Sequence, residues 1–148
     1  MDVAAEAGSS LLVEPRLMTE EDLPWVYTLC KKKYPYDYDW VTCEGWYRNI
    51  MLKQPMVYLP VRMPNAFCIA MMSILPWFPS DLECNVVFIV ADDGCMWEAM
   101  KCLRASIEWG RRRKAKLWRL SSDTDYDLRG MALRLGAKEI SPRYELRY

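Results

Sequence analysis

Hydrophobic residues recur along this chain with two different periods. Spacings of three and four residues, as at Leu23, Val26 and Cys30, predict amphipathic helices. Short runs rich in Val, Ile, Leu and Phe predict strands. The predicted helices span residues 20–33, 41–53, 93–113 and 128–135, and the predicted strands span residues 11–17, 56–63, 67–75, 82–90, 116–121 and 143–148.

The same pattern predicts which side chains each element buries. The helix at 41–53 should present one apolar face made of Trp46, Tyr47, Ile50 and Met51. The helix at 93–113 should bury a stripe made of Met96, Met100, Leu103 and Ile107. Alternation along the strand at 82–90 should divide its side chains between two faces, with Val86, Phe88 and Val90 on one and Val87 and Ile89 on the other.

Capping residues support the helix boundaries. Thr19 is expected to cap the first helix, with acidic residues in the first turn, and Pro35 ends that helix. Gly136 follows the last predicted helix at the position where glycine is favoured.

The order β-α-α-β-β-β-α-β-α-β predicts an α/β fold, formally α+β. We expect a mixed, mostly antiparallel central sheet of about six or seven strands, with helices on both faces. The 148 residues are enough for one domain with a proper core, which we place at 11–148. Residues 1–10 are small and acidic and are expected to form a flexible arm.

Charge and hydropathy exclude several classes of partner. The 20 Lys and Arg residues balance the 20 Asp and Glu residues, so no overall field favours nucleic acid or a membrane surface. No apolar run approaches the length of a membrane-spanning helix. The N-terminus does not resemble a secretory signal, so a cytoplasmic location is expected.

The six cysteines and the absence of histidine limit the available chemistry. No Cys-x-x-Cys pair is present, so no metal site is predicted. Most of the cysteines fall within apolar segments, which favours reduced, buried thiols. Without histidine, any catalysis must come from carboxylates, tyrosines, thiols or the backbone.

The junction between the strand at 82–90 and the long helix carries the clearest functional signal. A helix that begins just after a strand presents unpaired N–H groups to an anion. Here the connecting loop holds Asp92, Asp93 and a single glycine, Gly94, where a phosphate site favours several glycines and a cation. A like-charge contact near 4 Å costs on the order of 1–4 kcal/mol. The loop has the architecture of a phosphate site but an unfavourable charge.

The element order, together with two local motifs, resembles the GNAT superfamily of N-acetyltransferases over nearly the whole chain. The segment 103–109 followed by 115–120 resembles that family's cofactor helix and next strand, and 131–137 resembles its Leu-Gly ending. The chain also resembles GNAT-like proteins of bacteriophages, including small internal virion proteins.

This resemblance implies an acetyl-CoA site where the predicted strand at 82–90 meets the predicted helix at 93–113. Backbone amides would hold the cofactor at Val87, Phe88, Ile89, Val90, Gly94, Cys95, Met96 and Trp97. Glu83 is the candidate general base. Asp92, Asp93 and Glu98 would face the phosphates and weaken binding. Ala132 occupies the position of the family's usual tyrosine acid, so the implied site is degenerate.

Exposed aromatic residues suggest a different role. Trp and Tyr are enriched at protein interfaces, and two short segments rich in them are interface candidates. The candidate residues are Tyr34, Tyr36, Tyr38, Trp40, Trp77 and Phe78. Substrate binding and core packing are the alternative roles for this set.

Two functions therefore follow from the sequence. The preferred one is a GNAT-like domain without catalysis or cofactor, which acts through a protein partner, as a component of a phage virion within a bacterial host or through contacts with a second copy. The alternative is an active acetyl-CoA-dependent N-acetyltransferase that acts on an amine. A small-ligand binding module in the same cleft is a third hypothesis.

Overall fold

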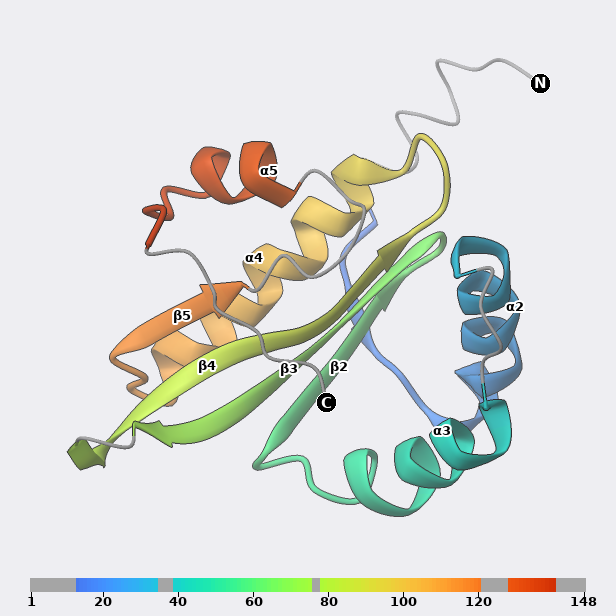
Figure 1. Cartoon of the computed structure of the whole chain (residues 1–148), viewed down its shortest axis with the longest axis horizontal. Helices are drawn as coiled ribbons and strands as arrows, with labels where there is room; N and C mark the ends of the chain where they lie inside the picture. The colour runs from blue at the N-terminus through green and yellow to red at the C-terminus, as the bar shows by residue number, and fades with distance from the viewer. Residues whose placement is uncertain (1–12, 35–38, 76–77, 121–127, 141–148) are drawn as a thin grey trace, which may run out of the picture.

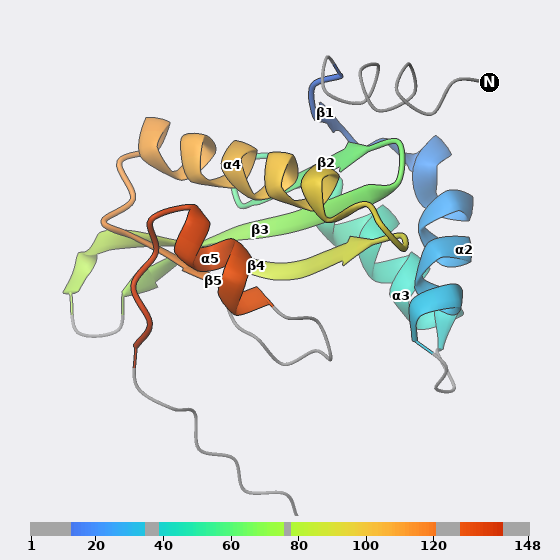
Figure 2. The same ribbon diagram turned by 90° about the horizontal axis from the view of Figure 1, so that it is seen from above.

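The computed structural model describes residues 13–34, 39–75, 78–120 and 128–140. Five strands form one sheet, with helices on both faces (Figures 1 and 2). The elements in chain order are β1 (Arg16–Leu17), η1 (Glu20–Asp22), α2 (Leu23–Lys33), α3 (Trp40–Trp46), η2 (Tyr47–Met51), β2 (Tyr58–Met63), β3 (Ala66–Leu75), β4 (Phe78–Ala91), α4 (Met96–Arg112), β5 (Leu117–Leu120) and α5 (Leu128–Arg134).

The sheet confirms the predicted class. Its strands follow chain order, β1-β2-β3-β4-β5, and each neighbouring pair is antiparallel except β4 and β5. That last pair is parallel because α4 carries the chain back along the sheet between them. Within the described ranges the sheet has fewer strands than predicted, and the strand expected at 143–148 lies outside them.

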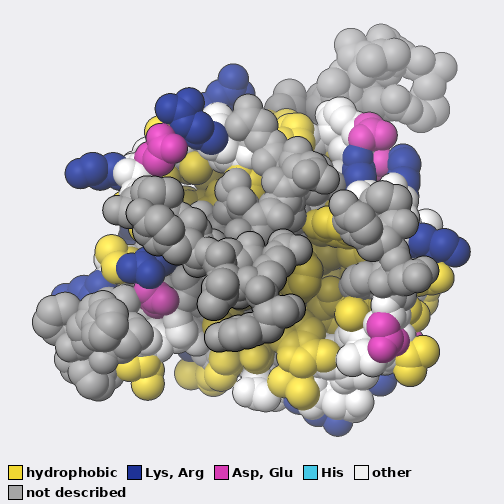
Figure 3. All heavy atoms as spheres, viewed as in Figure 1, with side chains coloured by type: hydrophobic (Ala, Val, Ile, Leu, Met, Phe, Trp, Pro, Cys, Tyr) yellow, Lys and Arg dark blue, Asp and Glu magenta, His cyan; other side chains and the backbone are white. Residues whose placement is uncertain are grey.

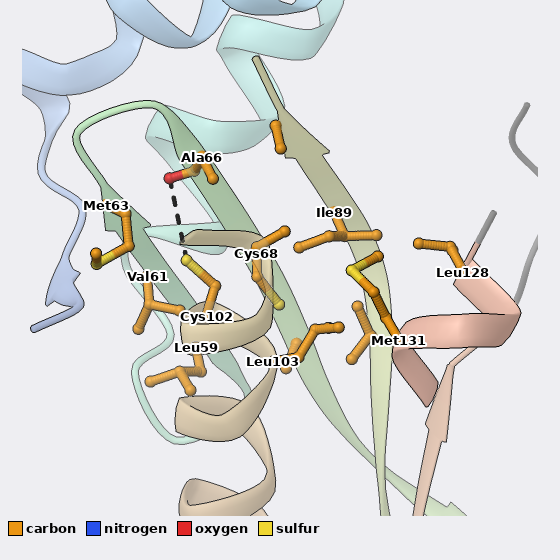
Figure 4. Packing of buried hydrophobic residues seen from close by; sticks show 14 of the residues in the cluster. Leu59, Val61, Met63, Ala66, Cys68, Ile89, Cys102, Leu103, Leu128 and Met131 are labelled. Atoms are coloured by element: carbon orange, nitrogen blue, oxygen red, sulfur yellow. Dashed lines mark hydrogen bonds between the residues drawn. The ribbon is translucent and has the colours of Figure 1, made fainter. Parts of the chain in front are cut away.

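Two apolar cores lie on opposite faces of the sheet. Successive residues of β3 divide between them: Cys68 belongs to the core under α4, whereas Phe67 and Ile69 belong to the core under α2 and α3. Figure 4 shows the first core, where Leu103 of α4 and Met131 of α5 pack over strands β2 to β4. The apolar run of β3 is explained by this burial on both faces.

The buried stripe of α4 differs from the predicted one. The helix begins at Met96 rather than near residue 93, and the Met96 side chain is 37% exposed. Met100 and Ile107 are only half-buried, while Leu103 is fully buried as predicted. The buried positions are Glu98, Ala99, Cys102, Leu103, Ser106, Trp109 and Gly110. Most of these side chains are small, so the helix packs close to the sheet, and the larger methionines lie at the margin.

The second predicted helix is confirmed, but its buried face is partly wrong. The helix ends in the wider turn η2, closed by a hydrogen bond from the Leu52 N–H to the Tyr47 carbonyl. Tyr47 and Met51 are buried there, whereas Ile50 is 41% exposed. A turn wider than an α-helix rotates the residues that follow it, which moves Ile50 out of the apolar face.

Thr19 is the N-cap residue of η1, as predicted, and an ion-pair cluster forms around Asp22 at the end of η1. Asp22 is 7% exposed and accepts hydrogen bonds from the Thr19 N–H at 2.9 Å, from two Arg16 nitrogens at 2.7 and 2.9 Å, and from Arg62 at 2.8 Å. The Arg62 guanidinium also lies 3.5 Å from the ring centroid of Trp25. This cluster ties β1, η1 and β2 together. Of the described part of the predicted strand at 11–17, which begins at residue 13, β1 covers only Arg16 and Leu17.

None of the six cysteines is in a disulfide, as predicted, and four of them are buried, whereas Cys43 and Cys95 are only half-buried. Burial raises the pKa of Cys84 to about 11 and the pKa of Cys102 to about 12. The pKa of Cys68 is also raised well above its ordinary value, because this thiol is fully enclosed. These thiols are packing residues rather than nucleophiles.

Two further structural predictions can be compared directly. Gly136 has φ +84, and the Gly136 and Ala137 N–H groups bond to carbonyls of the last turn of α5, so the predicted C-terminal glycine cap is confirmed. No helix within the described ranges is both long and apolar enough to cross a membrane.

Candidate functional site

The ladder between β4 and β5 stops halfway along β4. The two strands pair from Glu83 with Leu117 to Val86 with Leu120, where β5 ends. β4 continues to Ala91, so residues 87–91 have no partner on that edge among the residues that the structure describes. A strand edge of this kind offers free N–H and C=O groups to an extended ligand.

A β-bulge lies where this free stretch begins. On β3, Ile69 pairs with Phe88 and the next residue, Ala70, pairs with Val86, so Val87 is an extra residue on β4. Val87 is 40% exposed and Phe88 is 39% exposed. The bulge bends the strand and turns these two side chains outward.

The bulge also corrects the predicted alternation. Val86, Ile89 and Ala91 all pack in the core under α4, whereas Val90 packs in the core under α2 and α3. The prediction that Val86 shares a face with Val90, opposite Ile89, is therefore wrong. One inserted residue moves every following side chain of the strand to the opposite face of the sheet from the one expected.

The entrance of α4 carries unpaired backbone donors. Within the described part of the chain, the N–H groups of Gly94, Met96 and Trp97 make no hydrogen bond. Gly94 has φ +73, and a Cβ built there would meet no atom within 4 Å, so the space beside this turn is open. These donors meet the free edge of β4 at the positive end of the α4 dipole.

The acidic residues of this loop are not arranged as predicted. Lys32 of α2 binds the Asp92 carboxylate at 2.5 Å, and the neighbouring Lys33 binds Asp93. The hydrogen bond from Lys32 lowers the pKa of Asp92, so this carboxylate stays ionised and paired. The predicted net negative charge at the helix entrance is therefore wrong, because α2 supplies two matching cations.

Glu98 does not face the helix entrance either. Its side chain is 2% exposed and points back to the β2–β3 turn, where its two oxygens accept from the Asn65 backbone N–H at 3.0 Å and side-chain amide at 3.1 Å. Burial raises the pKa of the nearby Cys95 thiol, and Glu98 adds to that effect. Cys95 is thus a poor nucleophile, in line with a structural role.

Glu83 belongs to a polar cluster on the face of the sheet opposite α4. Its neighbour Cys84 packs under α4, so Glu83 and Asn85 point the other way. The Glu83 Oε1 atom accepts from Asn85 Nδ2 at 2.9 Å and from Ser73 Oγ at 3.3 Å. Arg119 of β5 completes the cluster, with its Nε atom 3.4 Å from Glu83 Oε2.

The structure places the aromatic candidates only in part. Tyr34 and Trp40 are half-buried against the core of α2 and α3, and the Trp40 ring centroid lies 5.0 Å from that of Tyr27. Apolar side chains gather beside α3 in Figure 3. Tyr36, Tyr38 and Trp77 lie outside the described residues, as does the side chain of Phe78.

A shallow groove lies elsewhere on the molecule. It has a volume of about 410 Å³, and its lining includes Met56, Ile74 and Arg113. Arg113 follows the last turn of α4, at the opposite end from Gly94, so the groove is separate from the helix entrance.

This chain is similar to known proteins in its structure, whereas comparison of its sequence found no match. No family model matches the chain, and no curated protein does. Solved structures do match it. A Trypanosoma brucei acetyltransferase superposes with TM-score 0.70 at 12% identity, covering 91% of this chain and 99% of that one. A GNAT family acetyltransferase of Staphylococcus aureus superposes with TM-score 0.66 at 14% identity, covering 90% and 97%.

The chain has the GNAT acetyltransferase fold. A third match is AAC(6')-Iy, in a complex with a bisubstrate analogue of CoA and monomethyl-acetylneamine, with TM-score 0.71 at 14% identity and coverage of 91% and 97%. The GNAT fold suggested by the element order is confirmed by these three structures. At such low identity they establish the fold and not the activity.

Several site residues had not been predicted from the sequence. Lys32 and Lys33 lie in the last turn of α2, and nothing in the sequence indicated that they pair with Asp92 and Asp93. Asn85 gave a weak signal, because it lies two residues after Glu83 on the same face of an otherwise apolar strand, whereas Arg119 gave none. The bulge at Val87 left no mark in the sequence.

Proposed function

We propose that this protein binds a coenzyme A thioester and transfers its acyl group to an amine. The observation that carries the proposal is the junction of the free β4 edge with the unpaired N–H groups of Gly94, Met96 and Trp97. The free strand edge suits an extended ligand arm that contains amide groups, and the unpaired N–H groups suit a diphosphate.

The residues fit such a donor. The backbone of residues 87–90 would pair with the pantetheine arm, and the amides at 94–97 would hold the diphosphate. Since Asp92 and Asp93 are each paired with a lysine, the electrostatic objection raised by the sequence loses most of its force. The match to a CoA-containing acetyltransferase structure adds support at the level of the fold.

We assign the proton transfer to Glu83. In the transfer, the neutral amine nitrogen bonds to the acyl carbon, the carbon–sulfur bond breaks, and the products are an amide, a thiolate and one proton. Glu83 is 9% exposed and lies on β4 four residues before the free edge begins at Val87, and we assign to it the proton that the amine gives up. Ala132 on α5 cannot protonate the leaving thiolate, so water would do so.

Glu83→Gln is expected to lower the rate of acetyl transfer to amines by about 100-fold or more, because the amide has a similar shape but cannot accept a proton. Binding of acetyl-CoA should change by less than about threefold, since Glu83 faces away from the helix entrance. Steady-state transfer and a donor titration on the same samples test this. A variant with full transfer activity would rule out Glu83 as the base.

A degenerate domain that acts through protein contacts is the second candidate. Ala132 at the position of the usual tyrosine favours it. A role in a phage virion, or in contacts with a second copy, rests on the sequence resemblance and on the aromatic segments alone. This candidate predicts that acetyl-CoA does not bind.

A further inference from the structure

One oxygen of Glu83 has an unsatisfied environment. The Oε2 atom is buried and makes no hydrogen bond within the described part of the chain, although its partner oxygen accepts two. Its contact with Arg119 is an ion pair rather than a hydrogen bond. A buried carboxylate oxygen without a hydrogen bond is costly, so a donor brought by a ligand would be stabilised here.

Arg119 stands beside this oxygen with most of its donors unused. Its Nε atom is 3.4 Å from Glu83 Oε2, and its terminal nitrogens bond to no described residue. The side chain is 47% exposed, so the guanidinium reaches solvent at the same face. A guanidinium presents a planar fork that matches a carboxylate or a phosphate.

We propose that the acceptor is an amine that carries an anionic group a few atoms away, with its nitrogen at Glu83 and its anion on Arg119. This inference rests on the proposed acyl transfer and adds the class of acceptor. An acceptor that carries only positive charge would be repelled by the Arg119 guanidinium when its amine approaches Glu83, because like charges repel. An acceptor that carries both an amine and an anionic group can bind Glu83 and Arg119 at the same time.

The test compares matched acceptors at saturating acetyl-CoA. β-Alanine is paired with β-alaninamide, and phosphoethanolamine is paired with ethanolamine, so each pair differs in the anion alone. The proteins are wild type, Arg119→Gln, Arg119→Lys and the control Arg104→Gln. Arg104 is exposed on α4 and makes no ion pair with any described residue. The readout is kcat/KM for each amine, together with a titration of acetyl-CoA.

Wild type should prefer the anionic member of at least one pair by about tenfold or more. Arg119→Gln should lower kcat/KM for that member by about 10- to 100-fold more than for the neutral member. Arg119→Lys should retain part of the preference, and Arg104→Gln should retain all of it. Which pair responds tells whether the anion is a carboxylate or a phosphate.

Other results would overturn the inference. Equal losses on both members would mean that Arg119 only holds Glu83 in place. A wild-type preference for neutral amines, or acetyl-CoA binding without turnover of any of the four amines, would also refute it and leave donor binding standing. If acetyl-CoA itself fails to bind, the proposed function fails instead, so the two failures are distinguishable.

Discussion

Gly94→Val is expected to reduce the affinity for acetyl-CoA by about 100-fold or more. Gly94 has φ +73, which costs a branched residue about 1–2 kcal/mol, and the new side chain would crowd the N–H groups at the entrance of α4. Losing two hydrogen bonds to a charged phosphate is worth about 1.5 kcal/mol or more each, which gives that loss. Calorimetric titration of the folded variant measures it.

Gly136→Val is the matched control for this substitution. Gly136 also has a positive φ, +84, and a Cβ there would also meet no atom within 4 Å, but it follows α5 rather than preceding α4. The control should lose a similar amount of stability and keep its affinity for acetyl-CoA. If both variants lose affinity equally, the effect comes from general destabilisation and the donor site is not at Gly94.

Asp22→Asn is expected to destabilise the protein by about 3 kcal/mol at pH 7. The substitution leaves Arg62, whose side chain is 13% exposed, without its carboxylate, and breaking one side of a buried ion pair is among the costliest single changes. Urea unfolding measures the change. The control is Glu44→Gln, which removes an exposed ion pair with Arg48 and should cost less than about 0.5 kcal/mol.

The effect of Asp22 should also depend on pH. Hydrogen bonds from Arg16, Thr19 and Arg62 hold the pKa of Asp22 well below its usual range. A carboxyl group whose pKa is lowered by folding contributes stability above the pKa of the unfolded chain, about 4, and this contribution is lost as the pH falls further. The gap between wild type and Asp22→Asn should therefore narrow from pH 4 to pH 2. A constant gap would mean that the charge of Asp22 is not what stabilises the fold.

Periodicity was sufficient for the architecture because the apolar runs are long and well separated. β3 is apolar on both faces and lies between two cores, and Gly136 ends α5 as its position predicted. These features depend on residues that are close together in the sequence, so one sequence is enough to predict them.

The site was predicted less well because it depends on local irregularities and on distant pairs. The extra residue at Val87 exchanges the faces of β4, and nothing in an apolar run such as 86–90 marks where a bulge falls. The pairing of Lys32 with Asp92 joins residues 60 positions apart. The sequence shows the negative charges of Asp92 and Asp93 but not their lysine partners from α2. The prediction of a negatively charged phosphate site followed from that missing information.

The central claim is that the edge of β4 and the entrance of α4 still form a donor site, with the loop's negative charge offset by α2. Calorimetric titration of the wild-type chain with acetyl-CoA tests it most directly. We expect saturable binding in the micromolar range, equivalent to about −8 kcal/mol. No heat of binding at millimolar acetyl-CoA would contradict the account and favour a protein that acts through its partners alone.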